Sequence, residues 1–407
     1  MELYPGQTDS HQSGKKLQAQ QGIIVQIRFI NSIFDISPEQ WNSLGPTTDP
    51  FVRYEFIAAL ESSGSTTEKS GWQPQHLLVF DHSQLVAAMP GYIKTHSYGE
   101  YVFDWAWADA YHHHGLNYYP KWVSAIPFTP CTGARLLCKS EVPINDFIPA
   151  IINALSSHSI AQGFSGWHCL FPSKELSEQL HTQGALQRIG CQFHWFNHHY
   201  QHFDDFLARM SSRKRKNILK ERRQVKEQGF YFSHKTGAQL SLDDWDIFYK
   251  LYRNTYLKRS GHNGYLSAQF FHTLGATMRE NILLVCAHKM GDKPDYMIAA
   301  ALFVRNDDTI FGRYWGCRDE YQFLHFETCY YQGIEFAISE GIARFDGGAQ
   351  GEHKIARGFE PVLTYSNHWI ARPDFASAIA DFTKQEARSV QLYTDEARSL
   401  LPFKDSE

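Results

Sequence analysis

The chain has 407 residues, of which 43% are hydrophobic and 20% are charged, and its formal net charge is −4. This length allows two ordinary domains with a substantial core, and the composition is that of a globular protein, not a disordered or fibrous one. The slight negative charge excludes a chain that binds nucleic acid over its whole surface. We therefore expect any phosphate binding to depend on a local patch, and we expect no DNA partner.

Seven cysteines are scattered along the chain, and no two of them form a Cys-x-x-Cys pair. This pattern argues against a disulfide framework and a structural zinc site, and it favours a reducing compartment. Residues 7–21 are polar and lack the apolar stretch of a secretory signal, and no apolar run reaches the length of a membrane span. We therefore expect a cytoplasmic protein in which residues 1–21 form a disordered tail.

Strand and helix patterns alternate through the first half of the chain. Residues 37–41, Ser-Pro-Glu-Gln-Trp, carry the signals of a helix start, with serine as the N-cap and proline at the first position. Branched and aromatic runs predict strands, and apolar residues at helical spacing predict helices. The predicted strands are residues 23–30, 75–80, 85–95, 101–107, 164–171 and 193–196. The further predicted helices are residues 53–60, 144–155 and 173–182.

The second half repeats this order of elements. Its predicted strands are residues 230–234, 282–288, 296–305, 309–316, 342–346 and 362–370. Its predicted helices are residues 242–257, 268–278, 324–339 and 375–400. The shared order is strand, two helices, three strands, helix and strand, which indicates a duplicated unit with a boundary near Tyr200. We expect an α/β (α+β) fold with one domain over residues 22–200 and a second over residues 201–407.

Weak local matches support the duplication. Residues 77–79 and residues 283–285 both read Leu-Leu-Val. Residues 104–107, Asp-Trp-Ala-Trp, and residues 313–315, Arg-Tyr-Trp, are predicted to lie at corresponding strand ends. The order of the elements carries more weight than these short identities.

This order is that of the GNAT acyltransferase fold, and four motifs make the resemblance narrower. They are residues 314–317 (Tyr-Trp-Gly-Cys), 324–331 (Leu-His-Phe-Glu-Thr-Cys-Tyr-Tyr), 351–354 (Gly-Glu-His-Lys) and 357–361 (Arg-Gly-Phe-Glu-Pro). With them the chain resembles the FemAB-like family, which is associated with peptidoglycan biosynthesis or recognition. The resemblance covers residues 33 to 372. It implies tandem GNAT-like units, each a mixed and mainly antiparallel sheet flanked by helices.

Two departures from the resemblance bear on the donor substrate. GNAT enzymes hold the pyrophosphate of CoA on a glycine-containing loop between the fourth strand and the next helix, whose N-terminus binds the anion. Residues 317–323, Cys-Arg-Asp-Glu-Tyr-Gln-Phe, fill that connection here and contain no glycine. No long antiparallel helical hairpin, as in well-known Fem enzymes, is readable either. The first departure argues against acyl-CoA and the second against aminoacyl-tRNA, so the sequence does not choose between these two donors.

The candidate site centres on residues 345–361, where glycines alternate with ionisable residues after the fifth strand of the second unit. Acyl transfer to an amine needs a base, donors for an oxyanion, and groups that hold both substrates. The catalytic candidates are Glu352, His353, His325 and Glu327, with Glu352 or His353 as the general base. The substrate-binding candidates are Lys354, Arg357, Arg313, Asp346 and Trp315, all expected to face one cleft. Alternatively, Glu352 and Arg357 form an ion pair that only fixes the loop, and Glu327 only favours a helix start.

Residues 209–226 carry nine basic side chains and a single acid, Glu221. Apolar residues at helical spacing predict an amphipathic helix that docks on the body of the protein. Arg213 and Arg215 on this helix are further substrate-binding candidates, for pyrophosphate, tRNA or an anionic membrane surface. The alternative is a helix face that is merely solvated. Adjacent histidines such as residues 112–114 cannot point the same way on a strand or loop, so we expect no metal site.

The sequence thus favours an acyl- or aminoacyl-transferase that forms an amide on an amine acceptor, in peptidoglycan precursor metabolism. Its acceptor would be a small molecule or a cell-wall precursor, and its donor aminoacyl-tRNA or acyl-CoA. A non-catalytic module that recognises peptidoglycan precursors or another phosphorylated ligand is the first alternative. A CoA-dependent N-acyltransferase is the second. Because the second unit holds most of the chemical candidates, we expect the first unit to be a scaffold.

Overall fold

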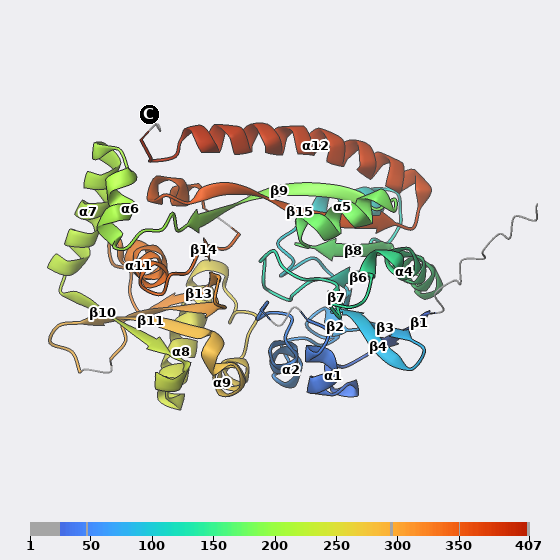
Figure 1. Cartoon of the computed structure of the whole chain (residues 1–407), viewed down its shortest axis with the longest axis horizontal. Helices are drawn as coiled ribbons and strands as arrows, with labels where there is room; N and C mark the ends of the chain where they lie inside the picture. The colour runs from blue at the N-terminus through green and yellow to red at the C-terminus, as the bar shows by residue number, and fades with distance from the viewer. Residues whose placement is uncertain (1–24, 46–47, 294–295, 350, 405–407) are drawn as a thin grey trace, which may run out of the picture.

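The computed structural model describes residues 25–45, 48–293, 296–349 and 351–404 (Figure 1). The predicted disordered tail, residues 1–21, lies outside the described residues. The elements of the first half are β1 (Val25–Ile30), α1 (Pro38–Asn42), α2 (Tyr54–Ser62), β2 (Trp72–Pro74), β3 (His76–Asp81), β4 (Gln84–Met89), β5 (Tyr92–Lys94), α3 (Trp105–His113), β6 (Lys121–Ser124), β7 (Leu137–Cys138), α4 (Ile148–Gln162), β8 (Gly166–Leu170), α5 (Lys174–Thr182) and β9 (Leu186–Phe196).

The second half begins with two helices and then repeats the strand and helix order. Its elements are α6 (Phe203–Arg209), α7 (Ser212–Glu227), β10 (Phe230–Thr236), α8 (Leu242–Ser260), α9 (Ala268–Thr277), β11 (Ile282–Lys289), β12 (Ala299–Arg305), β13 (Thr309–Cys317), α10 (Leu324–Phe326), the π-helical turn η5 (Glu327–Tyr331), α11 (Gln332–Ser339), β14 (Arg344–Asp346), the 3-10 turn η6 (Glu352–Arg357), β15 (Glu360–Ile370) and α12 (Pro373–Ser399).

Local sequence signals account for several of these boundaries. Ser37 caps α1 by accepting a hydrogen bond from the Gln40 N–H, the Gln40 side-chain oxygen accepts one from the Ser37 N–H, and Pro38 takes the first helical position. The helix predicted for residues 242–257 is confirmed as α8, which ends at Gly261 in the left-handed conformation that glycine tolerates.

One predicted strand, residues 101–107, is wrong. Helix α3 begins at Trp105, and the residues before it are irregular. Trp107 and Tyr111 are both buried, and their spacing of four places them on one helix face. The aromatic run that suggested a strand is therefore the buried face of a helix, and residues 104–107 do not correspond to the strand end at residues 313–315.

The two halves share one sheet. Its eleven strands lie in the order β10-β11-β12-β13-β14-β9-β15-β8-β6-β5-β2, and a separate four-stranded sheet has the order β1-β3-β4-β7. Strand β9, from the end of the first half, pairs with β14 and with β15, both from the second half. Helix α12 lies along β9 and β15 (Figure 1). The predicted boundary near Tyr200 follows β9 directly, and it stays a prediction.

Aromatic side chains from the two halves pack into a common core. Phe51 contacts Phe311 with ring centroids 5.0 Å apart, and Phe56 contacts Phe270 at 5.8 Å. All four rings are buried. Edge-to-face packing of this kind adds to the free energy of burial and fixes the angle between the packed elements.

Strands β13 and β14 are parallel, and they part after a short pairing. Thr309 to Phe311 pair with Arg344 to Asp346, beyond which β13 runs on to Cys317 without β14. The two strands therefore splay apart in the direction of their carboxyl ends, which opens the space described next.

Candidate functional site

A cavity of about 340 Å³, the second-unit cavity, lies where β13 and β14 part. Residues of β13, the end of α8, the start of α10 and the turn after β14 line it, and two residues come from the first half. The lining residues are Tyr101, Pro130, Thr255, Tyr256, Arg259, Ser260, Gly312, Arg313, Tyr314, Trp315, His325, Gly347, Gly348 and Ala349. The cavity therefore exists only when both halves are folded together.

Positive charge dominates the lining of this cavity, since Arg259 and Arg313 belong to it and none of the described lining residues is acidic. Arg313 donates from one terminal nitrogen to the Phe128 carbonyl oxygen at 2.7 Å and lies 3.4 Å from the Cys131 sulfur. Its Nε is buried without a hydrogen-bond partner among the described residues. A guanidinium with spare donors recognises carboxylate or phosphate.

His325 brings an uncharged imidazole to the same cavity. Its ring packs edge-on against Trp315, with centroids 5.3 Å apart. Burial lowers the pKa of His325 to about 3, and the positive charge of Arg259 acts in the same direction. At neutral pH the ring is therefore neutral and has one nitrogen free of a proton, which can accept a hydrogen bond or a proton.

The turn after β14, residues 347–349, forms one wall of the second-unit cavity. Asp346 and Lys354 bind this turn on the side away from the cavity. The Gly348 N–H donates to Asp346 at 2.8 Å, and the Lys354 ammonium donates to the Gly348 carbonyl oxygen at 2.8 Å. Burial lowers the pKa of Lys354 to about 8, while the Asp346 charge opposes that shift. Both side chains are buried. Neither lines the cavity, so they position the turn instead of contacting a ligand there.

The predicted general bases Glu352 and His353 lie outside the second-unit cavity. Both side chains are exposed on η6. Glu352 accepts a hydrogen bond from the Tyr393 hydroxyl at 3.0 Å, and His353 bonds to the Tyr330 hydroxyl at 2.9 Å. The expectation that all candidates face one cleft is wrong for these two, because η6 directs them towards α12 and α10–η5.

Arg357 and Glu327 are also turned away from the cavity, towards α7. The guanidinium of Arg357 donates to both carboxylate oxygens of Glu221 at 2.9 Å and lies 3.5 Å from the centre of the Phe326 ring. Glu327 accepts from Arg222, which also binds Glu335. The alternative pair Glu352–Arg357 is not formed either. These ion pairs attach α7 to the body, and their geometry is that of structural contacts.

Arg213 and Arg215 lie on α7, away from the second-unit cavity. The docked face of this helix carries the buried Ile218 and Val225. Arg213 is exposed and Arg215 is half-buried. The predicted amphipathic helix is thus present, with a basic outer face that is described further below.

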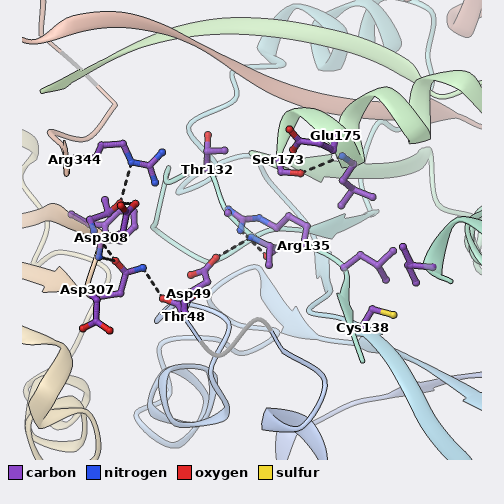
Figure 2. Close-up of a pocket in the computed structure, with 18 of the residues that line it drawn as sticks. Thr48, Asp49, Thr132, Arg135, Cys138, Ser173, Glu175, Asp307, Asp308 and Arg344 are labelled. Atoms are coloured by element: carbon purple, nitrogen blue, oxygen red, sulfur yellow. Dashed lines mark hydrogen bonds between the residues drawn. The ribbon is translucent and has the colours of Figure 1, made fainter. Parts of the chain in front are cut away.

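A larger cavity of about 640 Å³, called the first-unit cavity, lies between residues 132–138 and the start of α5 on one side and the turn before β13 and the start of β14 on the other. Figure 2 shows Arg344 and Asp308 on one side of it and Ser173 and Glu175 on the other.

Its buried polar groups are already bound to the protein. Arg135 donates to the carbonyl oxygens of Leu170, Ala134 and Cys131, and Asp49 accepts from the N–H groups of Ala134 and Phe51. Burial raises the pKa of Asp49. The larger volume therefore offers a ligand fewer free partners than the smaller cavity does.

Sequence reasoning found Arg313, Trp315 and His325, and it missed Tyr101, Tyr256 and Arg259. Tyr256 and Arg259 lie in the final turns of α8, where the helical spacing of apolar residues indicates a core face and does not indicate a binding site. Tyr101 and Pro130 reach the cavity only through docking of the two halves, which no local pattern encodes.

No helix in residues 25–404, the gaps at 46–47, 294–295 and 350 apart, is long and apolar enough to cross a membrane. In the same part of the chain, no three His, Cys, Asp or Glu side chains gather closely enough to hold a metal ion.

Comparisons with known proteins agree with this architecture. A family model named FemAB-like and described as peptidoglycan biosynthesis/recognition matches residues 32–405. No curated protein matches the chain. Among solved structures, the C-terminal domain of an Agrobacterium fabrum protein named as a lysylphosphatidylglycerol synthetase is 11% identical, with 85% of this chain and 95% of that chain covered and a TM-score of 0.50.

The structure of FemX is 8% identical to the chain, with 87% of this chain and 100% of that chain covered and a TM-score of 0.50. A tandem GNAT protein from the clavulanic acid biosynthesis pathway is 9% identical, with 86% and 99% covered and a TM-score of 0.46. The element order, the parting of β13 and β14, and the match over residues 32–405 together identify the chain as a member of the FemAB-like family with a tandem GNAT-like fold.

Proposed function

We propose that the protein transfers an acyl or aminoacyl group to an amine acceptor in the second-unit cavity. The observation that carries the proposal is that two arginines and a neutral imidazole, and no acidic side chain, line the cavity where β13 and β14 part. Membership of the FemAB-like family supports a role in peptidoglycan precursor metabolism.

The chemistry assigns His325 the role of general base. The amine nitrogen attacks the carbonyl carbon of the donor, a C–N bond forms, and the C–O bond of an ester or the C–S bond of a thioester breaks. His325 accepts the proton that the amine loses and returns it to the leaving oxygen or sulfur. A ring with a pKa near 3 is a weak base, and it serves here because an amine that has attacked a carbonyl becomes strongly acidic.

The remaining residues hold and orient the substrates. Arg259 and Arg313 bind a carboxylate or phosphate of donor or acceptor. Beyond Phe311 the edge of β13 is no longer paired with β14, so its backbone groups are available to the oxygen of the reacting carbonyl. Lys354 and Asp346 keep the turn of residues 347–349 in position, as described above. In this proposal Glu352, His353, Glu327 and Arg357 are not in contact with the reacting atoms.

The basic outer face of α7 is proposed to bind the polyanionic part of the donor, either aminoacyl-tRNA or an anionic surface that presents the precursor. Its exposed cations are Arg213, Lys216, Lys220, Arg223 and Lys226. They recur every three or four residues, so they form a stripe along the helix. Only Glu227, 3.5 Å from Arg223, offsets this charge on the same face. Such a stripe adds affinity without sequence selectivity.

Recognition without transfer is the second candidate, and the weak basicity of His325 favours it. The same two arginines would then hold a phosphorylated precursor that is never modified. An acyl-CoA donor stays possible in the proposal, although residues 317–323 offer no glycine-containing pyrophosphate loop.

Ligand-dependent stability tests these functions. We expect one of three compound classes, namely acyl-CoAs, aminoacyl-tRNAs and UDP-linked muropeptides, to raise the melting temperature selectively. The stabilising donor and acceptor are then incubated together, and amide formation is followed by mass spectrometry. Stabilisation with amide formation supports transfer. Stabilisation without amide formation, for every donor tried with a stabilising acceptor, contradicts transfer and supports recognition.

A further inference from the structure

A third cavity of about 240 Å³, the side cavity, adjoins the second-unit cavity. Tyr101 and Ala349 line both of them. Gln192 lines the side cavity, and its amide donates at 2.8 Å to the carbonyl oxygen of Pro130, a lining residue of the second-unit cavity. The two spaces thus share a wall and meet at Tyr101.

Apolar side chains from distant parts of the chain form the side cavity. They are Val102 and Phe103 before α3, Phe171 after β8, Ile189 on β9 and Val390 on α12. The uncharged polar residues Gln192, Thr364, Tyr365 and Ser366 also line it. The charged residues that line the side cavity, Arg188 and Glu386, bind each other through two hydrogen bonds of 2.6 and 2.7 Å. Because this pair is neutral as a whole, the side cavity suits an apolar chain and does not suit a charged group.

Tyr101 stands at the junction in an unfavourable backbone conformation. Its φ is 61°, in the left-handed region that residues other than glycine rarely adopt. The hydroxyl of Tyr101 contacts Tyr256, another lining residue of the second-unit cavity. Backbone strain of this kind persists only where the surroundings hold it, and it is concentrated at binding sites. Here it places an aromatic ring between the charged and the apolar space.

We infer that the two cavities form one binding site for an anion that carries an apolar chain. The carboxylate or phosphate lies against Arg259 and Arg313, and the chain passes Tyr101 into the side cavity. This inference rests on the proposed function, because it names the chemical class of the acyl group or the acceptor that the transfer would use. It adds a selection by chain length, which the charged cavity cannot provide by itself.

Linear carboxylates from acetate to decanoate are suitable probes, with binding measured by calorimetry in the absence of any donor. We expect the affinity to rise about fourfold for each added methylene until the side cavity is full, and then to level off. An affinity that does not depend on chain length would overturn the inference. It would leave the transfer reaction untouched, whereas a failure of transfer would leave these binding data standing.

Substitutions on α12 test whether the apolar chain of the ligand lies in the side cavity. Val390→Trp fills the side cavity, so we expect at least tenfold weaker binding of the longest carboxylates and unchanged binding of acetate. Leu392→Trp is the matched control, because Leu392 is 72% exposed on the same helix and does not line the cavity. Identical chain-length profiles for Val390→Trp and the natural protein would contradict the proposed path.

Two further variants keep the test decisive. Val390→Ala enlarges the side cavity and should move the plateau to longer chains, so the inference stays testable if the tryptophan variant does not fold. Arg259→Gln should weaken all carboxylates by the same factor, because Arg259 contacts the anionic end that they share. A loss confined to long chains in Arg259→Gln would overturn the assignment of the two ends.

Discussion

In each half, one strand of a parallel pair carries a buried or half-buried cation, β6 beside β8 and β13 beside β14, and the two units use this cation in opposite ways. Lys121 on β6 is 1% exposed and bonds to Glu100 at 2.9 Å, to Asp104 at 2.5 Å and to Ser97 at 3.1 Å. Arg313 on β13 has no carboxylate at hydrogen-bond distance among the described residues, and it lines the second-unit cavity. The first unit neutralises its cation within its own core, while the second leaves its cation available to a ligand.

The same contrast holds for the cavities themselves. The first-unit cavity is the larger one, yet its buried polar groups bind the protein backbone. The second-unit cavity is smaller and keeps one buried donor, the Nε of Arg313, without a partner among the described residues. Volume is therefore a poorer guide to function here than the hydrogen bonds that remain unmade.

The largest expected effect concerns Lys121. Lys121→Met removes the charge that compensates Glu100 and Asp104, so we expect the free energy of unfolding to fall by about 3–5 kcal/mol in urea denaturation. Lys174→Met is the control, because Lys174 is exposed and forms a long surface ion pair, 3.7 Å, with Glu178. This substitution should change the free energy of unfolding by less than about 0.5 kcal/mol. An equal loss of unfolding free energy in both variants would contradict the claim that the first unit neutralises Lys121 within its core.

The next largest effect concerns the rate of amide formation, which should depend on the second-unit cavity and not on the first-unit cavity. His325→Ala should lower kcat for amide formation about 100-fold or more, since it removes the general base. Glu175→Gln changes a residue of the first-unit cavity and should leave kcat within about twofold. If the glutamine variant loses as much activity as the alanine variant, the chemistry does not belong to the second-unit cavity alone.

The pH dependence of stability sharpens the comparison within the second unit. The pKa of His325 is depressed to about 3 by burial, so the unfolded chain, with a pKa near 6.5, binds the proton more tightly. The contribution of neutral His325 to the free energy of unfolding is therefore complete above pH 6.5, and it is lost as the pH falls towards 3. We expect His325→Ala to lose stability less steeply over this range, by about 1 kcal/mol per pH unit in denaturant titrations. Parallel pH profiles would contradict the burial of this ring.

The smallest expected effect on stability concerns the outer face of α7. Replacing Arg213, Lys216, Lys220 and Arg223 by glutamine should change the unfolding free energy by less than about 1 kcal/mol. If this face binds tRNA, the slope of log affinity against log salt should become shallower by about 3. Bulk tRNA and vesicles with anionic lipid are the probes. An unchanged slope with both would exclude the face as a polyanion site.

Local chemistry made much of this fold predictable from the sequence. The Ser37 cap, the helical spacing of Trp245, Phe248 and Tyr252, and the branched runs of β11 to β13 each depend on neighbours close in the chain. Helix α3 was misread because an aromatic run can bury one face of either a strand or a helix.

The candidate site was only partly predictable. Arg313, Trp315 and His325 follow from the order of the elements, since β13 and the helix after it flank the opening. The order of the elements does not predict the partners of Arg357 and Glu327, because these partners come from α7, more than a hundred residues away in the chain. The contribution of Tyr101 and Pro130 depends on the docking of the halves, which side-chain patterns in one half cannot reveal.

The position of β9 between β14 and β15 has a consequence for synthesis of the chain. The edges of β8 and β9 receive their partner β15 from residues 360–370, which are synthesised more than 160 residues after β9. At ordinary rates of translation these edges wait on the order of 10–30 s for their partner. An unpaired strand edge is a site of aggregation. Overproduction of this protein should therefore depend on chaperones that shield the nascent first half, and slow translation should increase that dependence.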